Sequence, residues 1–432
     1  MTCSISIKRY VPPAALGLAG LLAFAPALSA AADSVAKFYK GKTVTIWVGY
    51  TPGGGYDVYA RTFARHWGKH LPGNPEFIVK NRPGAGSLLV TNELYNILPK
   101  DGTAIGVIGR GMPQEKLLGN DQAEFESSKF TWIGSANNEV SVCVSWAKTG
   151  IRTFQDLKTR GMIVGGTGEG ADTDTFPKVL NNVLGTKLKL VTGYPGGTDV
   201  LFAMEKGELE GRCGYSWSSA VTTHGDWLRD KKMNVLLQIS TEKHPDLPDV
   251  PFVMDLAENA QDRDVLEFVF ARQAWGRPFL APPGVPADRA KALQDSFMAV
   301  TRDPAFIADV KKQKLEINPL SGQRVAQLIA RMYQTPVEIV NLAREATDKE
   351  DKIQITKAKL KEITVKGRIT DVTKGGRAVR FEGGGQKGEI TISGSRTKIT
   401  IGGGKGSRKQ LKKGMSCEFV YTGSAAKAIS CS

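Results

Sequence analysis

The stretch TVTIWVGYTPGGGYD, residues 43–57, decides the fold class of this chain. Its first eight residues are mostly β-branched or apolar, which predicts a buried strand over residues 43–50. The three glycines at positions 53–55 then predict a tight turn. Beyond the turn, large apolar residues recur every four positions, as on the buried face of a helix, at Tyr59, Phe63, Trp67 and Leu71. Strand, glycine loop and helix in this order indicate an α/β fold.

The same order returns further along the chain. A second strand and glycine turn are predicted at residues 77–86, and the pattern restarts at residues 162–170 and again at 187–198. Amphipathic segments at residues 287–300 and 321–346 predict long helices that return to the first lobe.

These repeats predict two α/β lobes with a cleft between them. Lobe 1 is expected to comprise residues 36–136 and 244–347, and lobe 2 residues 137–243. A small all-β domain is expected at residues 353–432, because short strand-like segments alternate there with glycine clusters. This last domain is similar to a small barrel of the OB type.

The composition excludes several classes of protein. Of the 432 residues, 41% are hydrophobic and 23% are charged, as in globular proteins and unlike disordered, collagen-like or polytopic membrane chains. The net charge of +15 is unevenly distributed: residues 348–432 hold 19 basic and 8 acidic residues, an excess of 11. The chain is therefore a nearly neutral body with a basic C-terminal domain.

The N-terminus predicts export. Residues 1–32 contain Lys8 and Arg9, an apolar run at residues 14–28 and a small-residue end at 30–32, which together form the pattern of a cleaved signal peptide. The apolar run is too short to cross the roughly 30 Å hydrocarbon core of a bilayer. We therefore expect a protein that works in an oxidising space outside the cytoplasm.

Four cysteines remain after the signal peptide. Cys417 and Cys431 flank the last predicted hairpin, and we expect them to form a disulfide. Cys143 and Cys213 are expected on neighbouring strands of lobe 2, where they are either bridged or buried as small apolar thiols.

The basic C-terminal domain predicts a patch of positive charge beside Phe419 and Tyr421. It consists of Lys405, Arg408, Lys409, Lys412 and Lys413. The patch could bind an anionic envelope polymer or lipid headgroup, or it could be a solvated basic surface. Nucleic acid is not expected as a partner, because an exported protein seldom meets it.

The glycine loops are the main chemical signal. A strand that runs into glycines and then a helix exposes backbone N–H groups at the positive end of the helix dipole, and an anion binds favourably there. Alternatively, the glycines only make tight turns between strands and helices. No nucleotide-binding loop, catalytic triad or metal-binding motif is present in the sequence, so we expect no enzyme activity and no cofactor or metal.

An ordered series of short motifs resembles the extracytoplasmic solute receptors of tripartite tricarboxylate transporters, the Bug-type receptors. The motifs lie at residues 50–57, 60–61, 81–86, 99–103, 130–134 and 194–197. The resemblance implies a type II periplasmic-binding-protein fold, a periplasmic location, and an organic carboxylate held between two lobes by loops at helix N-termini. It also implies a monomer that delivers its ligand to an integral-membrane permease.

The resemblance also implies which residues bind the ligand. The first loop supplies Tyr50, Thr51, Gly53, Gly54, Gly55, Tyr56 and Asp57; the second supplies Gly166, Thr167, Gly168, Gly170 and Ala171; the third supplies Tyr194, Gly196, Gly197 and Thr198. Asp57 is expected to cap the first helix rather than touch an anion, because like charges repel.

Three charged residues near these loops have two interpretations each. Arg110 is the basic side chain that the sequence places near the cleft, where it could pair with a second carboxylate or lie on the surface. Glu169 and Asp172 could meet a hydroxyl or ammonium group of the ligand, but we expect them to be solvated.

A second function of another class stays open. The body could report ligand occupancy to a membrane sensor, with the basic barrel docking to an anionic partner. In that case the protein is an interaction or sensory protein rather than a transport receptor.

Overall fold

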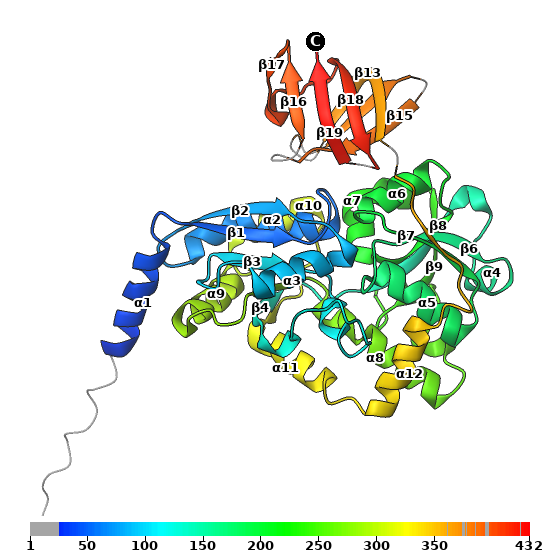
Figure 1. Cartoon of the computed structure of the whole chain (residues 1–432), viewed down its shortest axis with the longest axis horizontal. Helices are drawn as coiled ribbons and strands as arrows, with labels where there is room; N and C mark the ends of the chain where they lie inside the picture. Colours follow the sequence, from blue (N-terminus) through cyan, green and yellow to red (C-terminus); the bar gives the residue numbers. More distant parts are fainter. Residues whose placement is uncertain are drawn as a thin grey trace, which may run out of the picture.

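The computed structural model describes residues 26–360, 362–373, 376, 378–384, 386–393, 397–423 and 425–432. Residues 1–25 of the predicted signal peptide lie outside the described residues. Its last residues, 26–32, belong to α1 (Pro26–Tyr39). Two α/β lobes lie side by side, and a β-barrel lies beyond them (Figure 1). Within the described residues, no helix is long and apolar enough to span a membrane.

Lobe 1 is built on a six-stranded sheet with the order β11-β4-β10-β3-β1-β2. Its strands are β1 (Thr43–Val48), β2 (Glu76–Asn81), β3 (Ala104–Val107), β4 (Thr131–Ser135), β10 (Pro278–Ala281) and β11 (Leu320–Ser321). Because β1, β2 and β3 are parallel, the loops that follow them meet at one edge of the sheet.

Four helices cover this sheet or flank it. They are α2 (Gly55–Trp67), α3 (Leu88–Asn96), α9 (Ala287–Val300) and α10 (Pro304–Gln313). The apolar stripe that the sequence predicts on α2 packs into an aromatic core: the Phe63 ring stacks on Phe297 with centroids 4.8 Å apart and lies 5.0 Å from Phe279. This core fixes the direction of α2 and therefore the position of its N-terminus.

Lobe 2 has a second six-stranded sheet, with the order β12-β7-β6-β8-β5-β9. Its strands are β5 (Ser141–Trp146), β6 (Met162–Gly165), β7 (Leu188–Thr192), β8 (Gly211–Ser216), β9 (Met233–Ile239) and β12 (Ile355–Lys357). Its helices are α4 (Phe154–Thr159), α5 (Asp172–Leu184), α6 (Gly197–Glu205) and α7 (Trp217–Arg229). A buried disulfide between Cys143 and Cys213 joins the neighbouring strands β5 and β8.

The helices after lobe 2 differ from the prediction. The single helix expected at residues 321–346 is two helices, α11 (Gly322–Met332) and α12 (Val337–Asp348). Pro336 prevents one continuous helix over these residues, because proline lacks the N–H that a helix interior needs and its ring clashes with the preceding turn. α11 returns to β4 of lobe 1 as expected, but α12 packs against α5 of lobe 2 and against α8 (Ala260–Phe270).

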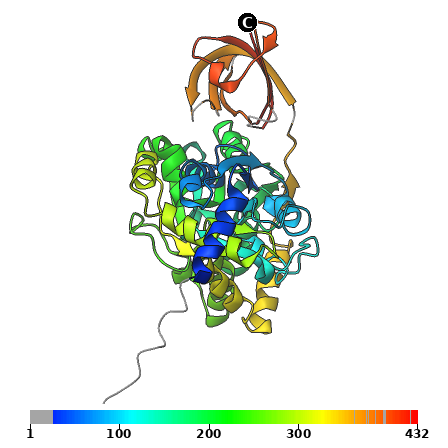
Figure 2. The same ribbon diagram turned by 90° about the vertical axis from the view of Figure 1, so that its left-hand side faces the viewer.

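The C-terminal domain is a closed barrel, seen nearly end-on in Figure 2. Its strands are β13 (Glu362–Thr373), β14 (Ala378–Gly383), β15 (Gln386–Thr391), β16 (Lys398–Ile401), β17 (Gly404–Lys405), β18 (Ser416–Thr422) and β19 (Ala425–Cys431). A pairing of β15 with β19 closes the sheet, and a disulfide between Cys417 and Cys431 joins β18 to β19. Phe419 and Tyr421 are fully buried in the barrel core, so they offer no exposed aromatic surface to a partner of the predicted basic patch.

Candidate functional site

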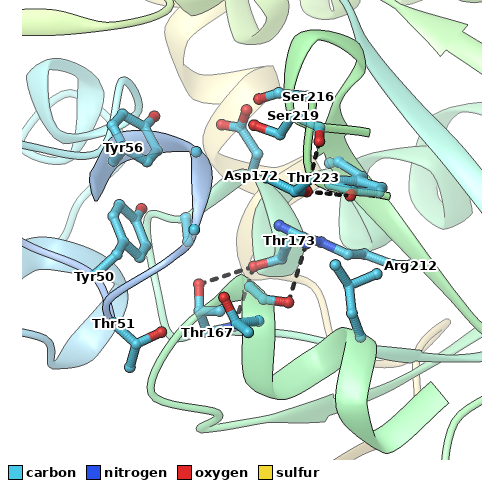
Figure 3. A pocket seen from close by; sticks show the side chains of 18 of the residues that line it. Tyr50, Thr51, Tyr56, Thr167, Asp172, Thr173, Arg212, Ser216, Ser219 and Thr223 are labelled. Atoms are coloured by element: carbon cyan, nitrogen blue, oxygen red, sulfur yellow. Dashed lines mark hydrogen bonds between the residues drawn. The ribbon is translucent and has the colours of Figure 1, made fainter. Parts of the chain in front are cut away.

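A cavity of about 60 Å³ lies between the two lobes, at the point where four helices begin (Figure 3). α2 begins there at Gly55, α5 at Asp172 and α6 at Gly197, and α7 begins after the lining residue Ser216. The first N–H groups of a helix have no acceptor within the helix, and the dipole makes this end positive. Four positive helix ends therefore border one small space.

The cavity is lined by most of the predicted loop residues. Those that line it are Tyr50, Thr51, Gly53, Gly54, Gly55, Tyr56, Arg110, Thr167, Ala171, Gly197 and Thr198. Those that do not line it are Asp57, Gly166, Gly168, Gly170, Tyr194 and Gly196.

Asp57 supports the first loop from beneath. Its carboxylate accepts a hydrogen bond from the Gly53 N–H at 2.8 Å and pairs with Arg61 Nη2 at 2.8 Å. The N-cap residue of α2 is Gly54, and Asp57 lies in the first turn of the helix. The expectation that Asp57 is the capping residue is therefore wrong. Because Asp57 already accepts the Gly53 hydrogen, this amide cannot also be given to a ligand.

Asp174 supports the second loop in the same way. Its buried carboxylate accepts hydrogen bonds from the Gly168 N–H at 2.9 Å and from the Thr192 hydroxyl. Burial raises the pKa of Asp174, although these hydrogen bonds lower it. Gly168 therefore shapes the loop rather than the cavity wall.

The two lobes are in direct contact around the cavity. Gly86 of lobe 1 donates its N–H to the Thr167 carbonyl of lobe 2 at 2.9 Å. Thr51 of lobe 1 lies so close to Gly196 of lobe 2 that a Cβ at Gly196 would collide with its hydroxyl. The cleft is therefore closed, and Gly196 is required for this close approach rather than for contact with the cavity.

Arg110 lines the cavity, but its guanidinium is already paired. Its Nε lies 2.6 Å from Asp172 Oδ2, and its Nη2 donates to Ser216 Oγ at 2.6 Å. Burial alone would lower the pKa of Arg110, but Asp172, together with Tyr56 and Glu139, more than offsets this and raises it. Asp172 is 7% exposed, so the expectation that it is solvated is wrong, whereas Glu169 is exposed as expected.

A second buried arginine beside the cavity is neutralised in the same manner. Arg277 Nη2 lies 2.9 Å from Glu139 Oε1 and donates to Ser219 Oγ at 2.8 Å. Both side chains are nearly inaccessible to solvent. The sequence did not indicate Arg277, because it approaches the cleft from the strand that returns to lobe 1 after lobe 2.

Arg212 differs from these two arginines, since no carboxylate pairs with it among the described residues. Its Nη1 donates to the Gly197 carbonyl at 3.2 Å, and its buried Nε has no hydrogen-bond partner in the described structure. Burial, together with the positive charges of Arg110 and Arg277, lowers the pKa of Arg212 to about 10. In Figure 3 its guanidinium points across the cavity toward Tyr50 and Tyr56.

The remaining polar groups around Arg212 are neutral. Burial raises the pKa of Tyr50 well above its usual value and that of Tyr215 to about 12, so both phenols keep their protons at neutral pH. The Arg212 guanidinium also lies 4.3 Å from the centroid of the Tyr215 ring. The cavity thus combines one uncompensated cation, neutral hydroxyl groups and four positive helix ends, which suits an anion.

The sequence contained one signal for Arg212 that was overlooked. The predicted strand at residues 210–215 is otherwise small or apolar from Gly211 onward, and an arginine in a buried strand needs an anionic partner or access to a ligand. Strand β8 lies between β6 and β5 in the sheet, and this order brings Arg212 beside Gly197.

Comparisons with known proteins agree with this geometry. No family model matches the chain. A curated relative, the UPF0065 protein in the TAR-I ttuE-ttuC' intergenic region of Agrobacterium vitis, is 26% identical over 275 residues, which are 62% of this chain and 74% of the relative.

Solved structures share the fold. The periplasmic binding protein BugD has a TM-score of 0.59 at 19% identity, over 71% of this chain and 98% of its own. MatC from Rhodopseudomonas palustris, solved with bound malate, has a TM-score of 0.56 at 18% identity, over 69% and 99% of the two chains. R. palustris Rpa4515, solved with adipate, has a TM-score of 0.56 at 15% identity, over 70% of this chain and 97% of its own.

These comparisons confirm the resemblance to the Bug-type receptors and the two-lobed fold of the periplasmic binding proteins. BugD is named as a periplasmic binding protein, and none of these matched proteins carries the name of an enzyme.

Proposed function

We propose that this protein is a periplasmic solute receptor that binds an organic carboxylate between its two lobes. The observation that carries the proposal is Arg212, whose charge no acid balances among the described residues, whereas Asp172 and Glu139 balance the other two arginines of the cavity. A buried cation without a partner is costly, and an anionic ligand removes that cost.

The carboxylate is expected to lie between Arg212 and the N-termini of α2 and α6. Gly54, Gly55, Gly197 and Thr198 line the cavity and lack bulky side chains, so a carboxylate oxygen can approach their backbone closely. Each helix end contributes about 0.3 to 1 kcal/mol to anion binding, and a charge-assisted hydrogen bond from Arg212 about 1.5 to 3 kcal/mol. Arg212 is therefore the dominant contact.

The proposal extends to the whole chain. Residues 1–32 are removed as a signal peptide during export. Residues 36–136 with 244–347, and residues 137–243, act as the two lobes, and residues 353–432 act as a basic accessory barrel, except that α12 and β12 pack with lobe 2. The protein is a monomer that delivers its ligand to the integral-membrane permease of a tripartite tricarboxylate transporter.

A binding panel tests the proposal. The mature chain, residues 33–432, is titrated with acetate, succinate, malate, adipate and citrate, and thermal unfolding and calorimetry are recorded. At least one acid should raise the melting temperature, because a ligand that binds the native state stabilises it. No shift with any acid, together with a shift for sugars or cations, would remove the proposal.

A matched pair of variants tests the role of Arg212. Arg212→Gln should weaken binding of the acid by about 10- to 100-fold, as expected for the loss of one charge-assisted hydrogen bond. Arg152→Gln makes the same change at an exposed position of lobe 2 and should bind as the unchanged protein does. Equal affinities of the two variants would contradict the assigned role.

A further inference from the structure

Helix α6 contacts the barrel through one of its faces, formed by Asp199, Phe202 and Lys206. The spacing of three and four residues places these side chains on the same side of the helix. Phe202 is 8% exposed and belongs to the hydrophobic cluster of the barrel, where its ring lies 6.3 Å from that of Tyr421. The barrel core thus includes a side chain of lobe 2.

Two further contacts extend this interface. Lys206 Nζ lies 4.5 Å from the centroid of the Phe202 ring and 5.9 Å from that of Tyr421, so it covers both rings. At the other end of the face, a Cβ at Gly423 would lie 2.7 Å from Asp199 Oδ1, which shows how closely the turn between β18 and β19 approaches the helix. The barrel therefore contacts α6 along its length.

The barrel also approaches lobe 1. Arg408, in the 3-10 helix Arg408–Gln410, is half-buried. Burial lowers the pKa of Arg408, the charge of Arg61 lowers it further, and the charge of Asp57 raises it, so Arg408 lies within electrostatic range of α2. Asp57 is the residue that supports the first glycine loop, so the barrel faces α2 as well as α6, two of the helices that begin at the ligand cavity.

An outer cavity of about 470 Å³ lies between the barrel and lobe 2. It shares Thr198, Leu201, Thr223 and His224 with the inner cavity, and its barrel side includes Thr370 and Phe381. The inner and outer cavities are therefore neighbours, and barrel residues line the outer one. Figure 1 shows the barrel beside lobe 2, next to α6.

We propose that the barrel is a third wall of the cleft, bound to the Asp199, Phe202 and Lys206 face of α6, and that its binding there is coupled to closure of the cleft on the ligand. The proposal rests on the function proposed above. When the cleft opens, α2 moves away from α6, and a rigid barrel cannot keep its place beside both helices. Its contacts with α6 and the electrostatic interaction of Arg408 with α2 therefore add to the stability of the closed state, and a bound ligand in turn favours the attached barrel.

Two substitutions in the mature chain test the coupling. Phe202→Ala removes the ring that enters the barrel core, and Arg408→Gln removes the charge beside α2 without touching the barrel core. With the tightest-binding acid of the panel, each should lower the affinity by at least about fivefold, mainly through faster dissociation. Lys409→Gln, at the exposed neighbouring position, should leave both the affinity and the dissociation rate unchanged.

A ligand-free measurement separates this proposal from the function itself. Spin labels at Ile97 of lobe 1 and Thr159 of lobe 2, both exposed, report the distance between the lobes by electron double resonance. Phe202→Ala should shift the distance distribution toward a more open cleft, and Lys409→Gln should not.

The outcomes distinguish the two proposals. Unchanged affinity in both test variants, or an unchanged distance distribution in Phe202→Ala, would overturn the coupling. If the unchanged protein binds no carboxylate, the proposed function fails, and the distance measurement alone decides whether the barrel holds the cleft closed.

Discussion

Thr51 Oγ1 of lobe 1 donates a hydrogen bond to Asp199 Oδ2 of lobe 2 at 3.2 Å. The two residues are 148 positions apart in the chain; Thr51 lines the ligand cavity, and Asp199 lies in the first turn of α6, which begins at the cavity. The same carboxylate approaches Gly423 of the barrel. The first turn of α6 is therefore the place where both lobes and the barrel meet.

Removing the Thr51 hydroxyl should weaken the closed state. Thr51→Val keeps the shape of the side chain but loses the hydrogen bond to Asp199, and we expect about tenfold weaker ligand binding. Calorimetry with the acid identified by the panel measures the change. Thr51→Ser retains a hydroxyl and should restore most of the affinity; if it is as weak as Thr51→Val, the hydrogen bond is not the cause.

A methyl group at Gly196 should hold the lobes apart. The backbone of Gly196 is extended, with φ at −170°, so alanine causes no backbone strain, but its Cβ would collide with the Thr51 hydroxyl. Gly196→Ala should abolish tight binding without loss of thermal stability. Gly225→Ala is the control, because nothing lies within 4 Å of its added Cβ and it does not line the ligand cavity. Similar affinities in the two variants would contradict this account of closure.

Glu115 should make stability depend on pH. It is 2% exposed, and burial raises its pKa from 4.5 to about 7, although Asn120 and Arg272 lower it. Between these two values the folded state holds a proton that the unfolded state has lost, so stability falls as the pH rises through this window. The loss amounts to about 3 kcal/mol once the pH exceeds 7.

Glu115→Gln removes this ionisation and should therefore gain stability relative to the unchanged protein as the pH rises. The difference in unfolding free energy should grow by about 3 kcal/mol between pH 4.5 and pH 8, as measured by urea denaturation. A difference that stays constant over this range would show that Glu115 does not titrate in the folded protein.

The two disulfides should stabilise different parts of the chain. Cys143 and Cys213 are 70 residues apart, and the chain-entropy relation gives about 4 kcal/mol for a loop of that length; Cys417 and Cys431 are 14 apart, which gives about 3 kcal/mol. All seven tryptophans precede residue 348, so their fluorescence reports unfolding of the lobes alone.

Replacing Cys143 and Cys213 by alanine should accordingly lower the fluorescence midpoint in urea. Replacing Cys417 and Cys431 should leave this midpoint almost unchanged. The loss of barrel stability should be detected only by far-ultraviolet circular dichroism. A fall of the fluorescence midpoint in the second variant, as large as in the first, would mean that the barrel and the lobes unfold as one unit.

Local patterns in the sequence predict the elements of this fold well. The strand expected at residues 43–50 is β1 (Thr43–Val48), and the helix expected at 287–300 is α9 (Ala287–Val300). Period-two and period-four spacing of apolar residues suffices here, because each element buries one face against its own sheet. The break at Pro336 was visible in the sequence and was missed because the apolar spacing continues on both sides of it.

The ion pairs of the site could not be predicted in this way. Asp172 pairs with Arg110, 62 residues away and in the other lobe, so its burial depends on how the lobes meet and not on its neighbours in sequence. The isolation of Arg212 likewise depends on the order of strands in the second sheet. Glycine loops identify where an anion site can form, whereas side chains brought together by topology determine its charge.

Strand β12 has a consequence for how the barrel is held. Strand β12 (Ile355–Lys357) pairs with β7, so the chain is fixed to lobe 2 up to Lys357. Only four residues then connect β12 to β13, the first strand of the barrel. Such a segment reaches at most about 14 Å, so the barrel remains at an effective local concentration of about millimolar or higher beside α6. Even a contact too weak to join two separate molecules would therefore be occupied most of the time.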